Sequence, residues 1–424
     1  MTSAPAINDC FVHDRDRLRH DEALEILRAN LECVVGTEDV ALADCPGRIL
    51  AENVTAPQNV PLHTNAAVDG YAFAHSDLID QPLPVSKRIA AGDADPDPLA
   101  PNTVARIFTG ATMPQGADTV AMQEDCTADG GSVLLPAGLK AGANCRKAGE
   151  DLAEGATLLT ASSRLNAADI AAAASVGRAK LKVRSKLSIV TFASGNELRR
   201  AETNDEMLKI GQVWDANSVL LRALLSKLPV TIDDGGILPD RRNAVQSALE
   251  DAATRSDVIL TTGGASRGEE DHVLAALDSL GKRHLWQLAV KPGRPMMMGQ
   301  IPRSVGHDCL FMGLPGNPVA AMVCFLLYVR PALLQLAGAS PTVPIRYPLP
   351  AAFDIKSKKP DRREFLRGIL VERDGVAMID KFARDGSGLI SSLRESDGLI
   401  EIPEEVTSVQ RGEMVSFIPY HAFD

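Results

Sequence analysis

The sequence predicts a multidomain protein in which a doubly wound α/β domain is combined with β-rich modules. Three observations support this fold class. The chain has 424 residues, which is too long for one ordinary core. Between residues 184 and 337, strand-like apolar runs alternate with amphipathic helical patterns, as in a doubly wound parallel sheet. After residue 338 the helical patterns stop, and short strands recur about every ten residues, as in a small barrel or sandwich.

The N-terminal part predicts two helices that bracket a β-rich module. Residues 21–34 place apolar side chains at helical spacing with acids in the first turn. Residues 166–176 form a second helical pattern, with Asn166 as its cap and Gly177 as its stop. The intervening segment is rich in Pro and Gly, and its β-like runs are 104–108, 119–123 and 133–135. We therefore expect a β module inserted into an elongated helical arm.

The central and C-terminal parts divide into elements by the same periodicity. The α/β part predicts strands at 187–192, 230–235, 258–262, 285–290 and 310–313, and helices at 217–227, 241–255, 271–280 and 319–336. The last part predicts strands at 345–353, 363–371, 376–381, 398–402 and 413–418. These patterns predict an arm of residues 14–55 and 141–183, an inserted β domain of 56–140, an α/β domain of 184–337 and a C-terminal barrel or sandwich of 338–424.

Composition argues against several classes of protein. Apolar content is 45% and no apolar run of about 18 residues occurs, so we expect no membrane span. A net charge of −11 argues against nucleic acid as a partner. The seven cysteines are scattered without a Cys-x-x-Cys pair, which argues against a disulfide framework or a structural zinc site. The first ten residues carry neither a basic nor an apolar stretch, so we expect a cytoplasmic protein.

Two glycine-rich loops follow predicted strands of the α/β domain. Thr261–Ser266 places small residues where a phosphate could touch backbone N–H groups, although a plain tight turn would use the same residues. In Gly313–Pro318, Pro318 begins a helix and Asn317 is expected to cap it, which leaves free N–H groups as an anion seat. The alternative for this second loop is capping without any ligand.

Charged side chains lie on loops between these strands. Lys291 and Arg294 form a cation pair on a proline-rich loop that could grip an oxyanion or be a solvated turn. Arg362 and Arg367 could clamp a phosphate or merely brace a strand. We expect a structural or solvated role for His272. Five loop carboxylates are candidates for Mg²⁺, which prefers one or two carboxylates with phosphate oxygens and water; most such acids only solvate a surface. They are Asp69, Asp151, Glu197, Asp240 and Asp271.

Taken together and in order, these motifs resemble the MoeA family of molybdopterin molybdenumtransferases, which includes the E-domains of gephyrin and plant Cnx. The resemblance runs from about residue 14 to the end of the chain. Its segments are Asp69–Ala72, Arg106–Ala111, Pro114–Asp118, Gly149–Asp151, Ser194–Leu198, Gly263–Asp271, Lys291–Gly293 and Gly313–Pro318.

The resemblance implies four domains, with residues 184–337 as the molybdopterin-binding domain and residues 338–424 as a C-terminal β-barrel. It implies a homodimer whose active site combines residues of both subunits. It also implies a reaction in which adenylyl-molybdopterin and molybdate are converted to molybdenum cofactor and AMP. A divalent ion, Mg²⁺, would assist this reaction. The adenylating enzyme of the same pathway is a further implied partner.

Roles follow residue by residue from that resemblance. Asp69, Glu197 and Asp271 would hold the metal, and Asp240 and Lys291 would complete the catalytic set. The remaining residues would bind substrate. They are Gly263, Gly264, Ser266, Gly268, Pro315, Gly316, Asn317 and Pro318 for the pterin phosphate and nucleotide, Arg294, Pro295, Arg362 and Ser387 for molybdate, and Thr109 and Asp151 from the second subunit.

Five positions depart from the family pattern. The family has Met at Val68, Asp at Asn196, Lys at Gln287, Lys at Arg294 and Ser or Thr at Ala320. Because most of these changes touch the expected anion site, a paralogue that binds molybdopterin without catalysis is an alternative function. An adenylating enzyme of the same pathway is disfavoured by the additional domains, and a nicotinamide dehydrogenase by the missing Gly-x-Gly-x-x-Gly loop.

Overall fold

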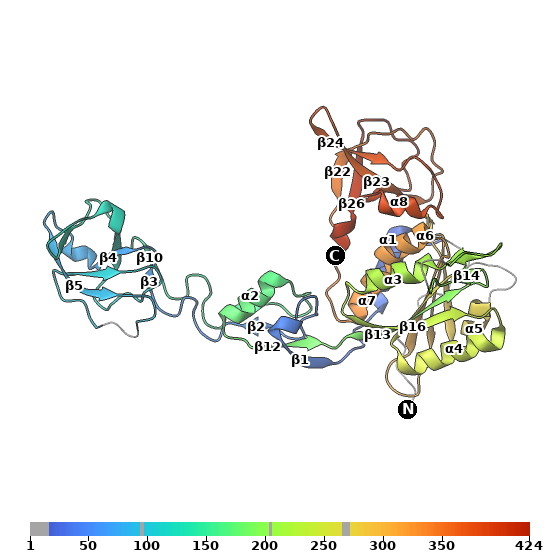
Figure 1. The fold of residues 1–424 in the computed structure, drawn as a ribbon, viewed down its shortest axis with the longest axis horizontal. Helices are drawn as coiled ribbons and strands as arrows, with labels where there is room; N and C mark the ends of the chain where they lie inside the picture. Colours follow the sequence, from blue (N-terminus) through green and yellow to red (C-terminus); the bar gives the residue numbers. More distant parts are fainter. Residues whose placement is uncertain (1–16, 94–96, 203–205, 265–271) are drawn as a thin grey trace.

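The computed structural model describes residues 17–93, 97–202, 206–264 and 272–424, with the backbone alone at 285–287. The molecule is elongated (Figure 1). A β-rich module occupies one end, a thin arm follows, and the α/β domain and the C-terminal β domain lie together at the other end. The domain limits predicted from the sequence remain a proposal.

The β-rich module is built on the sheet β7-β4-β6-β5-β9-β8, beside the short pair β3-β10. Its strands are β3 (Asn65–Ala66), β4 (Gly70–Phe73), β5 (Leu83–Ile89), β6 (Val104–Ile107), β7 (Thr119–Met122), β8 (Thr127–Asp129), β9 (Ser132–Leu134) and β10 (Cys145–Arg146). The three predicted β-like runs are confirmed as β6, β7 and β9. Glycine is needed at position 70, where β4 pairs with β7, because a Cβ there would lie 1.9 Å from the Ala121 carbonyl oxygen.

The arm consists of paired strands and one helix. Its elements are β1 (Thr37–Ala41) with β12 (Lys180–Arg184), β2 (Val54–Thr55) with β11 (Thr157–Leu159), and α2 (Ala167–Ser175). The predicted cap is confirmed: the Asn166 side chain accepts hydrogen bonds from the N–H groups of Ala168 and Asp169. A small apolar cluster that includes Leu50, Leu165 and Val183 holds the arm together.

The first helix does not join the arm. α1 (His20–Asn30) packs against α7 (Arg330–Leu336), and the Gln335 side chain donates to the carbonyl oxygens of Arg28 (2.8 Å) and Leu31 (2.6 Å). Ala23 and Leu27 are buried in the core of the α/β domain. The helical pattern of residues 21–34 is therefore correct in kind, but its apolar face belongs to the α/β domain.

The α/β domain contains the sheet β16-β13-β17-β21-β20-β18. β16, β13, β17 and β21 are parallel, and β20 and β18 are antiparallel additions. The strands are β13 (Leu187–Ser194), β16 (Val230–Leu238), β17 (Val258–Thr262), β18 (Lys282–Gln287), β20 (Pro295–Ile301) and β21 (Cys309–Leu314), with the short pair β14 (Leu198–Arg199) and β15 (Val213–Trp214) outside this sheet. β20 was not predicted, because its Met-rich run shows no alternation and has one β-branched residue.

Alternate residues of the sheet enter two cores. Ile189, Leu260 and Met312 pack with α3 (Ala216–Leu225), α6 (Pro318–Cys324) and α7. Val190, Ile259 and Phe311 pack with α4 (Arg242–Arg255) and α5 (His272–Leu280). Helices therefore cover both faces of the sheet, as the doubly wound pattern predicts.

One helical segment is long and apolar enough to cross a membrane. It runs over Pro318–Leu336, with a π-helical turn at Phe325–Val329 between α6 and α7, and its mean hydropathy is 1.8. The span is 89% buried inside the protein and contains Arg330. Its hydrophobicity is thus that of a central core helix.

The C-terminal domain is a curled sheet of order β19-β23-β25-β26-β22, with β24 beside β23. Its elements are β19 (Val290–Lys291), β22 (Tyr347–Pro350), β23 (Arg363–Arg373), β24 (Val376–Lys381), α8 (Ile390–Arg394), β25 (Gly398–Ile402) and β26 (Met414–Pro419). A hydrogen bond from Ala352 N–H to the Ile379 carbonyl (2.8 Å) closes the curl. β19 pairs in parallel with β23, so the chain from the α/β domain becomes the edge of the C-terminal sheet.

Candidate functional site

The carboxyl ends of the parallel strands bring two glycine loops together. Gly263 N–H donates to the Leu314 carbonyl (3.0 Å), and a Cβ on Gly316 would lie 3.7 Å from the Gly263 Cα atom. Gly263 has a φ of +82°, and a Cβ there would lie 2.4 Å from the Ser194 carbonyl oxygen. Only glycine fits at this position, so the loops after β13, β17 and β21 can pack closely at one sheet edge.

The loop Pro315–Pro318 is held differently from the prediction. Asn317 occupies the N-cap position of α6, but its side chain makes no capping hydrogen bond. Pro318 has no N–H, and Val319 N–H donates to the Ser387 carbonyl (3.0 Å). The C-terminal domain therefore takes one of the N–H groups that the sequence led us to expect to be free. The Gly316 carbonyl accepts from the Asn217 side chain (2.7 Å), a contact that the sequence did not reveal.

A cavity of about 460 Å³ lies between the α/β domain and the C-terminal domain. Its lining includes most of the residues predicted for the anion side of the site, which are Lys291, Arg294, Pro295, Pro315, Asn317, Arg362 and Ser387. Arg17, Arg367 and Asp385 also line it, as does Ala320, one of the departures from the family pattern. Segments distant in the sequence thus converge into one strongly basic cavity.

Lys291 and Arg362 reach this cavity through the β19–β23 pairing. Glu364, the register partner of Lys291, accepts a hydrogen bond from Arg362 Nε (2.9 Å) and forms an ion pair with Arg362 Nη2 (2.7 Å). Lys291 Nζ lies 3.5 Å from the other oxygen of Glu364. Gly293 has a φ of +108°, and its Cβ position would lie 2.5 Å from Cys324 Sγ, so the loop after Lys291 also requires glycine.

Arg367 has the bracing role that the sequence left open. It is buried and donates to Ser392 Oγ (3.1 Å) and to the carbonyl oxygens of Arg384 (3.1 Å) and Gly386 (3.3 Å). Burial lowers the pKa of its guanidinium. The loop that it braces presents Ser387 to the cavity.

Arg17 was missed by the sequence reading. Leu18 forms a β-bridge with Leu288, and Ala289 N–H donates to the Leu18 carbonyl (2.8 Å), which lays Arg17 along the cavity wall. No local motif could have revealed this placement, because it depends on pairing between segments about 270 residues apart, a long-range contact of the kind that tertiary structure alone creates.

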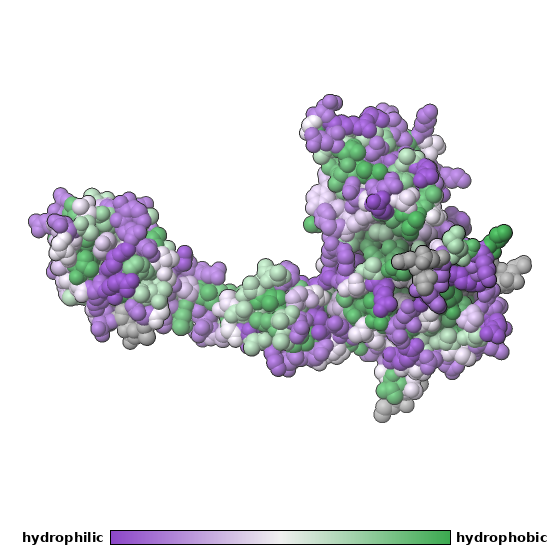
Figure 2. All heavy atoms as spheres, viewed as in Figure 1, coloured by the Kyte–Doolittle hydropathy of each residue, from purple (hydrophilic) through white to green (hydrophobic). Residues whose placement is uncertain are grey.

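A second cavity of about 700 Å³ adjoins the first and shares Asn317 with it. Glu197, Gln212, Trp214, Asn217, Gly316 and Pro318 contribute to its lining. Figure 2 shows hydrophobic atoms at the surface near β14, and Met207 and Ile210 are fully exposed between β14 and β15. An aromatic and amide lining beside a basic cavity suits a ligand with a planar ring and an anionic end.

Asp240 lies at the same sheet edge, in hydrogen-bond contact with Asn196. The Asn196 amide donates to Asp240 Oδ2 (3.0 Å), and His272 Nε2 lies 3.5 Å from Oδ1. An aspartate at position 196 would repel Asp240, so this departure from the family pattern replaces a like-charge contact with a hydrogen bond. His272 is thus a neighbour of a site carboxylate.

Asp69 and Thr109 form one unit in the distant β-rich module. Asp69 Oδ1 accepts from Thr109 N–H and from Thr109 Oγ1, both at 2.8 Å, and these bonds lower the pKa of the exposed Asp69 carboxyl. Asp151 N–H donates to the Val60 carbonyl (3.1 Å) near the arm. The module lies at the other end of the molecule from β21 and α6 (Figure 1), so a single chain does not bring Asp69 to Glu197.

Some predicted residues cannot be placed. Ser266, Gly268 and Asp271 lie outside the described residues, as does the side chain of Gln287. Gly264, next to them, is described and has a φ of +69°.

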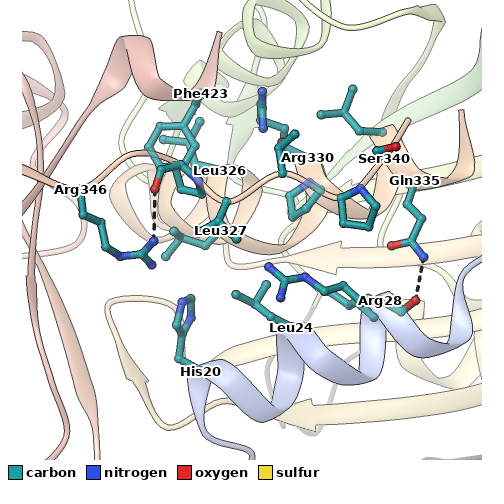
Figure 3. A pocket seen from close by; sticks show the side chains of 17 residues that line it. His20, Leu24, Arg28, Leu326, Leu327, Arg330, Gln335, Ser340, Arg346 and Phe423 are labelled. Atoms are coloured by element: carbon teal, nitrogen blue, oxygen red, sulfur yellow. Dashed lines mark hydrogen bonds between the residues drawn. The ribbon is translucent and has the colours of Figure 1, made fainter. Parts of the chain in front are cut away.

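A third hollow, the apolar groove, lies between α1, the helical span Pro318–Leu336 and the segment 340–346 (Figure 3). It has a volume of about 40 Å³, and α1, the π-helical segment, α7 and residues 340–346 line it. Leu24, Leu326 and Leu327 point into it, with Arg28, Arg330 and Arg346 around them. None of the predicted site residues that the structure describes lines it.

Three family matches and a solved structure show which proteins this chain is similar to. Residues 18–177 match the family described as MoeA N-terminal region (domain I and II), 193–335 match a probable molybdopterin binding domain, and 348–420 match the MoeA C-terminal region (domain IV). A crystal structure of a molybdopterin biosynthesis MoeA protein from Pyrococcus horikoshii superposes with a TM-score of 0.81 at 27% identity, covering 96% of this chain and 100% of that one.

Curated relatives carry consistent names. A molybdopterin molybdenumtransferase of Haemophilus influenzae is 32% identical over 405 residues, which is 95% of this chain and 98% of the relative. A Mycobacterium tuberculosis protein named molybdopterin molybdenumtransferase 2 is 31% identical over 388 residues, 88% of this chain and 92% of the relative. The gephyrin of Dictyostelium discoideum is 28% identical over 75% of this chain and 49% of its own length. The chain therefore belongs to the MoeA family.

Proposed function

We propose that this protein inserts molybdenum into molybdopterin, converting adenylyl-molybdopterin and molybdate to molybdenum cofactor and AMP. The observation that carries the proposal is the basic cavity, where Lys291, Arg294 and Arg362 converge beside the Pro315–Pro318 loop. The relatives named molybdopterin molybdenumtransferase support the same reaction.

The two adjoining cavities suit the two substrates. Molybdate is a small dianion, and a pocket with several cations compensates for the loss of its hydration shell. Adenylyl-molybdopterin has planar rings and a charged phosphoanhydride, which match the larger cavity with Trp214, Gln212 and Asn217. Because Asn317 lines both cavities, the two ligands would meet near the loop at the sheet edge.

Each candidate site residue has a role in this proposal. Lys291 would offset the charge that develops on the phosphoanhydride of adenylyl-molybdopterin while the bond that releases AMP breaks. Arg294, Pro295, Arg362 and Ser387 would hold molybdate. Gly263, Gly264 and the Pro315–Pro318 loop would let the substrate phosphate approach the backbone. Ser266 and Gly268 lie outside the described residues, and we propose that they bind the same substrate phosphate.

We propose Mg²⁺ as the cofactor. Among the described residues, no three His, Cys, Asp or Glu side chains form a metal cage. Mg²⁺ commonly takes only one or two protein carboxylates, completing its shell with substrate phosphates and water. Glu197 fits this use because it lines the larger cavity, and the hydrogen bond between Asn196 and Asp240 brings Asp240 to the neighbouring loop. Asp271 and Asp69 would add to this set, and the bound ion would neutralise phosphate charge.

We also propose a homodimer with a shared site. Asp69 and Thr109 are hydrogen-bonded to each other at the far end of the arm, away from their own α/β domain. A second copy could place this pair, together with Asp151, against Glu197 and Lys291. A cytoplasmic location and a contact with the adenylating enzyme of the pathway remain predictions.

The test is an assay of the purified protein with adenylyl-molybdopterin, molybdate and Mg²⁺. We expect release of AMP that depends on molybdate, together with a product that reconstitutes a molybdenum enzyme lacking its cofactor. Tight binding of adenylyl-molybdopterin with no molybdate-dependent AMP release would contradict the proposal and favour the non-catalytic paralogue.

A further inference from the structure

Glu364 is a buried acid that contacts Lys291 and Arg362, two of the cations that line the basic cavity. Its side chain is 8% exposed, whereas the side chains of Lys291 and Arg362 are 46% and 33% exposed. The carboxylate therefore lies beneath the two cations, and the cations lie between it and the solvent.

Both oxygens of this carboxylate are engaged by the same two cations. One oxygen accepts a hydrogen bond from Arg362 Nε (2.9 Å) and forms an ion pair with Arg362 Nη2 (2.7 Å), and the other oxygen lies 3.5 Å from Lys291 Nζ. Arg362 Nη1 and the remaining Lys291 protons make no further hydrogen bond within the described residues, so they are available to a ligand in the cavity.

The arrangement orders side chains that would otherwise be mobile. Lysine and arginine side chains are long, and they lose rotamer freedom when they are fixed. Two neighbouring cations also repel each other when no acid lies between them. The register of β19 on β23 places Glu364 opposite Lys291, so the backbone pairing itself sets this geometry.

We propose that Glu364 is a positioning residue of the oxyanion site, holding the Lys291 ammonium and the Arg362 guanidinium side by side toward the cavity. This inference rests on the proposed function of that cavity. Glu364 does not touch the oxyanion; it acts through the two cations. When molybdate binds, it takes the outward N–H groups, while Glu364 keeps its inward contacts and limits the net charge.

The test compares wild type with Glu364→Gln, which keeps the shape of the side chain but removes its charge. The matched control is Glu401→Gln. Glu401 is also a buried acid, and it accepts from Arg346 (2.7 Å) and Arg363 (2.8 Å), away from the cavity. Equilibrium dialysis measures the Kd for molybdate, and AMP release measures KM and kcat. Thermal unfolding reports stability for both variants.

We expect Glu364→Gln to weaken molybdate binding about tenfold and to raise the KM for molybdate by a similar factor, with kcat changed less than about threefold. Glu401→Gln should change the Tm without changing the Kd for molybdate. In a double-mutant cycle, Glu364→Gln should have less effect in an Arg362→Ala background than in wild type, because its partner is already missing.

The outcomes separate this inference from the proposed function. If wild type binds molybdate but releases no AMP, the enzymatic function is overturned. The Kd for molybdate of wild type and of Glu364→Gln would then still test the positioning role. Equal molybdate affinity of wild type and Glu364→Gln, or equal losses in Glu364→Gln and Glu401→Gln, would overturn the positioning role. A wild type that binds no molybdate would overturn both.

Discussion

The basic cavity and the apolar groove lie near the same strand, β23, but they use arginine in opposite ways. Arg362 shares the carboxylate of Glu364 with Lys291, so the cavity keeps an excess of positive charge. The next residue, Arg363, points to the other face of the strand and is saturated by Asp21, Glu401 and Glu404. Because its charge is fully matched, Arg363 joins α1 to the C-terminal domain instead of binding a ligand.

The basic cavity and the apolar groove also differ in volume and in the kind of side chain that lines them. The basic cavity has a volume of about 460 Å³, and backbone loops and cations line it. The apolar groove has a volume of about 40 Å³, and leucines and prolines from α1, α7 and residues 340–346 surround it (Figure 3). For Arg362 and Arg363, the number of acids around the guanidinium therefore distinguishes the residue that faces a cavity from the residue that joins two parts of the structure.

The largest effect is expected from Lys291→Ala. Removal of this cation should lower AMP release by about 10²- to 10³-fold, because charge on the phosphoanhydride would lose its nearest cation. The fold should persist, since Lys291 Nζ is partly exposed and its contact with Glu364 is long. An assay of AMP release with thermal unfolding as the control checks this, and a fully active variant would mean that the catalytic site lies elsewhere.

Arg363→Ala should remove the ion pairs that join α1 to the C-terminal domain. It would leave Asp21, Glu401 and Glu404 without their shared cation, and we expect a loss of about 3 kcal/mol in the free energy of unfolding. Urea unfolding measures this loss. Molybdate affinity of the folded variant should stay within about twofold of wild type; a large drop would show that the two sides of β23 are coupled.

The apolar groove also predicts acid sensitivity through His20. Burial, followed by the nearby Arg363 charge, lowers the pKa of His20 to about 4, and its Nδ1 lies 2.8 Å from the Tyr328 hydroxyl. Above pH of about 6.5 the residue is neutral in both folded and unfolded states. Between that pH and 4 the unfolded state alone gains a proton, so the free energy of unfolding should fall by up to about 3 kcal/mol.

Unfolding measured across that pH range tests this contribution. Wild type should lose stability by up to about 1.4 kcal/mol per pH unit from this residue, and His20→Gln should show a shallower dependence. Identical slopes for the two proteins would exclude His20 as the titrating group.

The smallest effect is expected at Arg17, the cation that the sequence reading missed. Arg17→Ala should weaken molybdate binding about tenfold or less, because the residue is exposed and its field is partly screened by salt. Arg19→Ala is the matched control, since Arg19 is also exposed and carries the same charge but does not line the cavity. Equal affinities for the two variants would remove Arg17 from the site.

Local sequence was sufficient for much of the secondary structure. β17, β24 and β25 have the predicted limits, and the Asn166 cap of α2 is confirmed. These features depend on periodicity, capping and turn residues that lie within a few positions of one another. The Met-rich strand β20 escaped because burial by its neighbours, rather than its own alternation, makes it a strand.

By itself the sequence determined the order of the elements, the glycine loops at the sheet edge and the family. Only the tertiary structure decided that α1 packs on α7, that β19 leaves the α/β domain for the C-terminal sheet, that Arg17 lines the basic cavity, and that Glu364 contacts two of its cations. The physical reason is that turn chemistry and amphipathic periodicity are local, whereas a carboxylate beneath two cations depends on strands that meet only after the chain has folded.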